Sequence, residues 1–176
     1  EKLMDLKLIT YPNKILETKI EKEWDFDNPP YDAVELKASM LKIMKDNLGI
    51  GLSTNQVGIT DVRAFVFFNQ QANNRESCET LCLHPKYVVT EDSVDIEMFE
   101  GCLSVPGVTL HINRPSTIKA TWKDEFGREF SEKLFGYQAR CFMHECDHLD
   151  GITMDQHVAP VKWKEALADA EAKAKK

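Results

Sequence analysis

Residues 135–149 read FGYQARCFMHECDHL, and this stretch decides the fold. Apolar side chains recur in it at helical spacing, which predicts a helix, and an aspartate-glycine pair follows to end that helix. His144 and His148 are four residues apart, so both imidazoles lie on one helical face, with Glu145 beside them. Imidazoles that bind a metal need shelter from water on one side and a cleft on the other. We therefore expect this helix at the centre of the fold.

The pattern His-Glu-x-x-His is a signature of metal-dependent hydrolases, although so short a pattern also occurs by chance in helices whose histidines face solvent. A second segment, residues 100–104 with the sequence EGCLS, supplies a thiol after a flexible glycine. Two histidines and Cys102 leave one position open on a tetrahedral ion, as in catalytic sites. The two segments together predict a catalytic metal site with Glu145 facing it.

The composition is that of an ordinary globular protein, with 43% hydrophobic and 29% charged residues. A chain of 176 residues can bury a core without disulfides or a structural metal, so a bound metal is expected to be functional. Residues 1–176 are predicted to form a single catalytic domain. The five cysteines are odd in number and irregular in spacing, which predicts reduced thiols.

Charge and hydropathy exclude two classes of partner. A net charge of −7 and a pI of about 5.3 leave no broad basic face, so no direct nucleic-acid binding is expected. No apolar run is long enough to span a bilayer, so no membrane association is expected either. The first residues lack a basic start followed by an apolar stretch, which makes the cytoplasm the expected location, or an organelle if a transit peptide has been removed.

The rest of the chain predicts short strands and two flanking helices. Residues 31–48 carry apolar side chains at helical spacing before Gly49, and residues 161–176 read as a surface helix. Residues 49–56 are expected to be a loop that enters a sheet. Strands are expected at residues 62–68, 86–90, 108–113, 116–122 and 128–133. The sum is an α+β fold, with antiparallel sheets around the central helix that carries the histidines and with flanking helices near the N- and C-termini.

Three segments, in this order, resemble those of one known family. Residues 49–56 (GIGLSTNQ), 100–104 (EGCLS) and 144–148 (HECDH) are similar to the glycine loop, cysteine segment and histidine helix of peptide deformylases. The resemblance extends over essentially the whole chain. It implies a metal-dependent hydrolase that removes the N-formyl group from the initiator methionine of newly made polypeptides and releases formate. N-formyl-methionyl peptides are then the expected substrates.

The resemblance also implies a role for individual residues. The implied ligands of one divalent ion are Cys102, His144 and His148. Glu145 would act as general base and acid. The Gln56 amide and the main-chain N–H of Leu103 would stabilise the oxyanion, and such donors typically contribute ~3–4 kcal/mol each. The implied substrate-binding residues are Ile50, Gly51, Gly101, Met98 and Cys141.

Two of these implied substrate contacts also make chemical sense. The backbone of Ile50 and Gly51 would pair with an extended peptide, because glycine permits close approach, although a turn alone would also explain this glycine. Cys141 lies three residues before His144 and would line the methionine pocket with Met98 as a small hydrophobic residue. A fourth ligand there would block the open position that hydrolysis needs.

The ligand spacing and the family resemblance predict different metal ions. A tetrahedral site of cysteine and histidine usually holds zinc. The family implies Fe(2+) in the working enzyme, with Ni(2+) or Co(2+) as active substitutes and Zn(2+) as a poor one. We expect Fe(2+), and hence loss of activity in air.

Two departures from the family pattern concern the loop and the pocket. Ser53 and Thr54 replace the usual alanine pair, which adds hydroxyls where the backbone packs against the site. Tyr137 and Arg140 stand where aliphatic pocket residues would be expected, which affects pocket depth and side-chain preference. We expect Arg140 to extend its charged head to the rim while its stem packs.

The C-terminal segment carries a local positive charge. Residues 161–176 hold five lysines against three acidic residues, in an acidic protein. In bacterial deformylases a C-terminal helix can dock near the ribosomal exit, so ribosome docking is one interpretation. A solvated surface helix explains the same charges.

Two other functions share part of the pattern. A zinc endopeptidase uses the same helix but takes its third metal ligand from a residue downstream of it. His157 lacks the glycine turn of metzincins, and Asp155 is no better supported as that ligand. A non-enzymatic metal-binding domain would need four closed ligands and no general base. Glu145 argues against that alternative.

Overall fold

The fold is α+β, as the sequence predicts, in a computed structural model that describes residues 2–72 and 78–176. Five antiparallel strands form one sheet in the order β1-β2-β3-β6-β7, and β4 and β5 form a separate antiparallel ribbon. The strands of the sheet are β1 Gly51–Ser53, β2 Ala64–Phe68, β3 Glu79–Val89, β6 Thr117–Lys123 and β7 Glu129–Phe135. The strands of the ribbon are β4 Asp95–Gly101 and β5 Thr109–Pro115.

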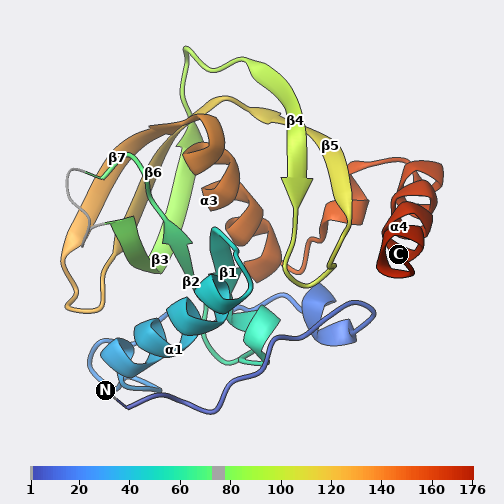
Figure 1. The fold of residues 1–176 in the computed structure, drawn as a ribbon. Coiled ribbons are helices and arrows are strands. Elements are labelled where there is room, and N and C mark those ends of the chain that lie inside the picture. The colour runs from blue at the N-terminus through green and yellow to red at the C-terminus, as the bar shows by residue number, and fades with distance from the viewer. Residues whose placement is uncertain (1, 73–77) are drawn as a thin grey trace.

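Helix α3, Gly136–Leu149, lies between the sheet and the ribbon (Figure 1). Its Phe142 packs edge to face on Phe65 and Phe67 of β2, with ring centroids 5.0 and 5.8 Å apart. Such aromatic pairs contribute about 0.5–1.5 kcal/mol beyond the area they bury. Nearly all of the helix from Ala139 onward is buried. The prediction of a central histidine-bearing helix is confirmed.

Helix α1, Ala33–Asp46, packs on the opposite face of the sheet, on the alternate residues of β2 and β3. Asp32 caps its N-terminus by accepting hydrogen bonds from the backbone N–H groups of Val34 and Glu35, at 2.9 and 3.1 Å. The helix ends earlier than the sequence predicts. Leu48 already has a φ of +58°, so the chain turns before Gly49.

The five expected strands are present, but β3 begins earlier than predicted, and β1 and β4 were not predicted. The expected loop at residues 49–56 contains β1 and a short 3-10 helix, Thr54–Val57. Strand β3 begins seven residues before the expected start, and its ladder shifts register between Leu83 and Lys86, around His84 and Pro85. A proline inside a run disrupts the strand pattern, which is why only the second half was predicted. Strand β4 was missed because its apolar residues, such as Ile96, stay partly exposed on a two-stranded ribbon and give no clean buried face.

Helix α4, Pro160–Ala174, lies beside β5 at the edge of the molecule (Figure 1). It begins with proline at its first position and packs Trp163 and Leu167 on a small apolar cluster of β5. Three short 3-10 helices complete the fold, Lys14–Glu17, Thr54–Val57 and Met154–His157. Within the described residues, no helix is both long and apolar enough to cross a membrane.

Candidate metal centre

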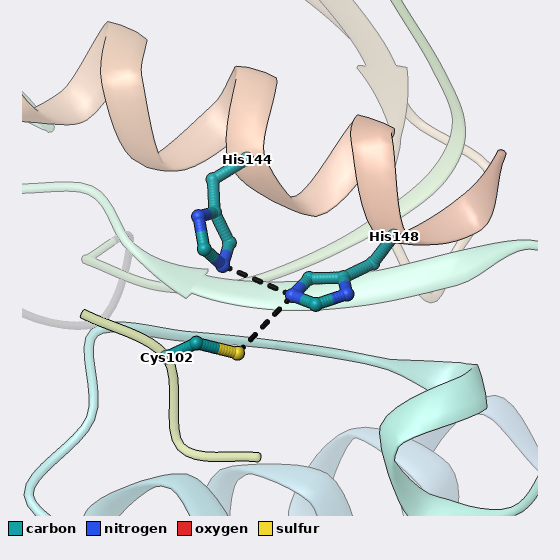
Figure 2. A group of neighbouring side chains, drawn as sticks. All are labelled: Cys102, His144 and His148. Carbon is teal, nitrogen blue, oxygen red and sulfur yellow. Dashed lines mark hydrogen bonds between the residues drawn. The ribbon is translucent and has the colours of Figure 1, made fainter. Parts of the chain in front are cut away.

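Two elements bring three metal-binding side chains together. His144 and His148 project from α3 toward Cys102, which directly follows β4 (Figure 2). The Nε2 atoms of the two histidines are 3.0 Å apart, and Cys102 Sγ lies 3.3 Å from His148 Nε2. All three donor atoms fall within 4.8 Å of one another. Two segments that are distant in the sequence therefore meet at one point.

Glu100 fixes the orientation of the His144 ring. Its Oε1 accepts a hydrogen bond from His144 Nδ1 at 2.9 Å, and Arg114 Nε and Nη2 hold its two oxygens at 2.5 and 3.0 Å. Burial opposes ionisation of Glu100, but the hydrogen bonds from His144 and Arg114 outweigh it and lower its pKa to about 2. An ionised carboxylate can only accept, so His144 Nδ1 carries a proton and its Nε2 is the nitrogen that faces Cys102 and His148.

The donor set fits a divalent metal ion. Burial lowers the pKa of His148 well below its usual value, so this ring is neutral. At His144 burial also opposes the charge, yet the hydrogen bonds with Cys102 and Glu100 raise the pKa well above its usual value. Positive charge is thus favoured where the three donor atoms meet. A bound cation would displace the second proton of His144, and two neutral imidazoles with one thiolate are ligands that zinc and iron accept.

Glu145 lies beside the donor atoms with its carboxylate against the glycine loop. The side chain is 3% exposed, and among the described residues its Oε1 has no hydrogen-bond partner. Burial is the main cause that raises the Glu145 pKa to about 7. A Cβ atom at Gly51 would lie less than 3.0 Å from Glu145 Oε2 and from Cys141 Sγ, so a larger residue there would displace the Glu145 carboxylate. A carboxylate with such a pKa and a free oxygen suits proton transfer near neutral pH.

The three segments surround a cavity of about 530 Å³. Its wall brings together most of the residues that the resemblance implies: Ile50, Gly51, Gln56, Gly101, Cys102, Leu103, Cys141, His144 and Glu145. Burial raises the pKa of the Cys141 thiol well above its usual value, so this side chain is neutral. Met98 is not brought to the wall. It lies half-buried on β4, opposite Ile112 of β5.

Gln56 is held by the loop from which it projects. Its Oε1 accepts the backbone N–H of Ser53 at 3.0 Å, which fixes the amide orientation, and its Nε2 donates to Ser104 Oγ at 2.9 Å. The N-terminal arm adds two backbone bonds, from Ile9 N to Gln56 O and from Tyr11 N to Ser104 O, both at 2.7 Å. The arm therefore ties the glycine loop to the cysteine segment.

The two hydroxyls that replace the family's alanine pair are both hydrogen-bonded, one within the glycine loop and one to the segment that precedes β2. Ser53 Oγ donates to Asn55 Oδ1 at 2.6 Å, and Thr54 Oγ1 donates to Val62 O at 2.8 Å. Asn55 in turn donates its side-chain amide to the backbone carbonyl of His148. A buried hydroxyl that finds a partner costs little and stiffens its surroundings. Hydrogen bonds thus hold the loop internally and attach it to the end of α3.

The expectation that Arg140 reaches the rim is wrong. Its side chain is 4% exposed and its guanidinium turns inward to Glu100, because a carboxylate and two backbone carbonyls offer buried partners there. Tyr137 is exposed and does line the mouth of the cavity.

No sequence pattern indicated the chain of polar side chains behind the metal-binding residues. Arg114 bonds Asp147 Oδ2 at 2.8 Å in addition to Glu100, and His157 Nε2 lies 2.8 Å from the same Asp147 oxygen. These residues come from β5, α3 and the segment after it, so no local spacing marks them. His157 bonds Asp147 and is not in the donor group with His144, which agrees with its rejection as a peptidase ligand.

These features define a class of protein. A His-Glu-x-x-His helix buried between antiparallel sheets, with a cysteine as the third donor and a carboxylate at an open cavity, is the arrangement of an α+β protein with a single metal site of the catalytic type.

Comparisons with known proteins narrow this class to one family. The family model of polypeptide deformylase matches residues 5–164. A peptide deformylase of Prochlorococcus marinus (strain NATL1A) is 39% identical over 122 residues, which are 69% of this chain and 59% of the relative. Peptide deformylase 1B, chloroplastic/mitochondrial, of Arabidopsis thaliana is 36% identical over 147 residues, which are 84% of this chain and 52% of the relative. The chain thus spans little more than half the length of these two curated relatives.

A solved structure agrees with the sequence comparisons. The peptide deformylase from Synechococcus elongatus in complex with actinonin superposes with a TM-score of 0.82 at 28% identity, over 95% of this chain and 88% of that one. The chain belongs to the polypeptide deformylase family, whose members depend on a metal. The resemblance drawn from the three motifs is confirmed.

Proposed function

We propose that this protein removes the N-formyl group from the initiator methionine of newly made polypeptides and releases formate. One observation carries the proposal: a carboxylate with a free oxygen, Glu145, stands beside the donor group of Cys102, His144 and His148 at the wall of an open cavity. Family membership supports the same reaction. We further propose that residues 1–176 form one catalytic domain.

Cys102, His144 and His148 are the proposed ligands of one divalent ion, with Fe(2+) as the working metal. A thiolate and two neutral imidazoles would leave the site with a net charge of about +1, which preserves Lewis acidity. When bound, the ion supplies that acidity, which polarises a carbonyl and makes water a nucleophile near neutral pH. Ni(2+), Co(2+) and Zn(2+) are proposed substitutes.

Glu145 is the proposed proton carrier. Its carboxylate takes one proton from the attacking water as oxygen bonds to the formyl carbon, and gives that proton to the methionine nitrogen as the C–N bond breaks. One water is consumed, and the products are formate and a free amine. Burial raises the pKa of Glu145 to about 7, so both protonation states are accessible near neutral pH.

Gln56 and the backbone N–H of Leu103 are the proposed oxyanion donors. Both residues line the cavity, and Gln56 is held from both ends of its amide. Donors that are fixed before the reaction need no reorganisation as charge develops. The support for this role is the position of Gln56. Its Nε2 donates to Ser104 Oγ, and this bond holds the amide at the cavity wall.

The proposed substrate lies along strand β1. This strand is at the edge of the sheet and bonds to β2 on one side, so its other side is open to an added peptide strand at Ile50 and Gly51. Cys141 and Gly101 contribute to the wall of the proposed methionine pocket, from which Met98 is absent.

The partners follow from this reaction. Nascent formylated chains are the proposed substrates, in the cytoplasm or in an organelle, without direct nucleic-acid or membrane binding. Ribosome docking by α4 is proposed on the lysines of its exposed side, because its apolar side packs on β5. Reversing the charges of Lys162, Lys164 and Lys173 should abolish co-sedimentation with ribosomes, and unchanged co-sedimentation would rule docking out.

The reaction can be tested directly. The protein, purified without oxygen and loaded with iron or nickel, is incubated with a formyl-methionyl tripeptide while formate release and peptide mass are followed. Formate with an intact deformylated peptide supports the proposal. Cleavage at an internal peptide bond would favour a peptidase, and metal binding without any reaction would favour a non-enzymatic member of the family.

A further inference from the structure

Arg140 makes three strong contacts inside the protein. Its Nη1 donates to Glu100 Oε2 and to Ile112 O, both at 2.7 Å, and its Nη2 donates to Ile96 O at 2.6 Å. The side chain is almost fully buried. A buried arginine with all its partners on neighbouring strands acts as a cross-link between elements.

These contacts join the two elements that carry the metal-binding side chains. Arg140 stands on α3 one turn before His144, whereas Ile96 and Ile112 belong to β4 and β5. Strand β4 ends at Gly101, directly before Cys102. The distance from the cysteine to the histidines therefore depends on how the ribbon is held against α3, and Arg140 holds both of its strands.

Arg140 also shares the carboxylate that orients His144. Glu100 accepts bonds from Arg140, Arg114 and His144 at once. The two guanidinium groups balance the two carboxylates of Glu100 and Asp147. Without Arg140 the Glu100 carboxylate loses one of its two guanidinium partners, and two backbone carbonyls of the ribbon lose a donor from α3.

We propose that Arg140 is a positioning residue that sets the spacing of Cys102 from the two histidines and thereby controls how tightly the metal is held. The inference rests on the metal site proposed above. It concerns a residue whose place is taken by an aliphatic side chain in the family pattern described above. Residues that bond a metal ligand directly, as Glu100 bonds His144, typically contribute about 10–100-fold in metal affinity, and Arg140 acts one contact further from the metal.

The test compares Arg140→Met and Arg140→Lys with a matched control, Arg63→Met. Arg63 is also largely buried and also donates to two backbone carbonyls, those of Ile20 and Leu149. It pairs with the carboxylates of Asp150 and Glu23, and it contacts neither Glu100 nor the ribbon. The dissociation constant of Co(2+) is measured by competition with a chelator, the visible absorption of the cobalt form reports ligand geometry, and the thermal midpoint of the metal-free protein reports stability.

We expect Arg140→Met to weaken cobalt binding by about tenfold, the lower end of the effect of a direct ligand partner, and to change the cobalt spectrum. Arg140→Lys should fall between it and the unmodified protein, because lysine keeps the charge but cannot reach three acceptors. Arg63→Met should lower the thermal midpoint while cobalt affinity stays within about twofold.

Two results would overturn the inference: cobalt affinity and spectrum unchanged in Arg140→Met, or an equal loss of affinity in Arg63→Met. If Arg140→Met does not fold, Arg140→Lys decides by the same criteria. An unmodified protein that binds cobalt but releases no formate would overturn the proposed function alone. An unmodified protein that binds no cobalt would overturn both.

Discussion

Glu100 Oε1 accepts the Nδ1–H of His144 at 2.9 Å, and this bond decides which nitrogen of the ring faces the donor group. Without it the ring can rotate or carry its proton on Nε2, where it would block a metal. The carboxylate is therefore as much a part of the site as the three donor atoms.

Glu100→Gln should weaken metal binding by about 10–100-fold, because the amide keeps the shape of the carboxylate but lacks its charge. It also leaves Arg114 and Arg140 without their shared counter-ion, which should cost about 3–5 kcal/mol of stability. Metal titration and chemical denaturation measure the two effects separately. Metal affinity equal to that of the unmodified protein would show that Glu100 does not orient His144.

Glu145→Ala should keep the metal and lose turnover. The side chain is not one of the three donors, and loss of a general base typically lowers kcat by about 10²–10⁴-fold. Metal content by elemental analysis and formate release, measured on the same sample, check both halves of the expectation. Full activity in this variant would remove Glu145 from the reaction.

Gly51→Ala tests the contact between the glycine loop and the base. The added Cβ would lie 2.4 Å from Glu145 Oε2, which forces the carboxylate to move, so kcat/KM should fall at least about tenfold with metal content unchanged. At Gly101 an added Cβ would meet its nearest neighbour, Val108 O, at 3.6 Å, an ordinary contact. Gly101→Ala should therefore lose far less activity, and equal losses in both variants would contradict this explanation.

Part of this site could be predicted from sequence because its signals are local. His144, Glu145 and His148 share one helical face, and the same helix carries the apolar residues that bury it, so its central place followed. Strand β4 gave no such signal, since its side chains stay partly exposed on a two-stranded ribbon.

The polar network could not be predicted because it depends on tertiary contacts. Glu100, Arg114 and Asp147 come from three elements. Only the fold brings the Arg114 guanidinium within hydrogen-bond distance of both carboxylates, at 2.5 and 2.8 Å. Arg140 shows the same limit. A long charged side chain on a pocket wall usually extends to solvent, and here a buried carboxylate and two carbonyls outweigh that tendency.

The metal itself gives a prediction that involves no substitution. If Fe(2+) is the working ion, the iron-loaded protein should lose activity in air while an anaerobic sample keeps it. A nickel-loaded sample in air is the control, because Ni(2+) is not readily oxidised. Equal activity of the iron samples with and without oxygen would exclude ferrous iron as the working metal.

Leu48 is 93% exposed at the mouth of the cavity and has a left-handed backbone, with φ of +58°. Such a conformation costs a leucine about 1–2 kcal/mol, whereas asparagine adopts it readily, so Leu48→Asn should raise the free energy of unfolding by about 1 kcal/mol. An exposed apolar side chain at the cavity mouth is placed to contact the residues that follow methionine in the proposed substrate. We therefore expect the same variant to raise KM several-fold for formyl-methionyl peptides with leucine or phenylalanine in second place, and to leave KM unchanged for those with aspartate. A uniform change across all peptides would mean that Leu48 shapes the loop and does not contact the substrate.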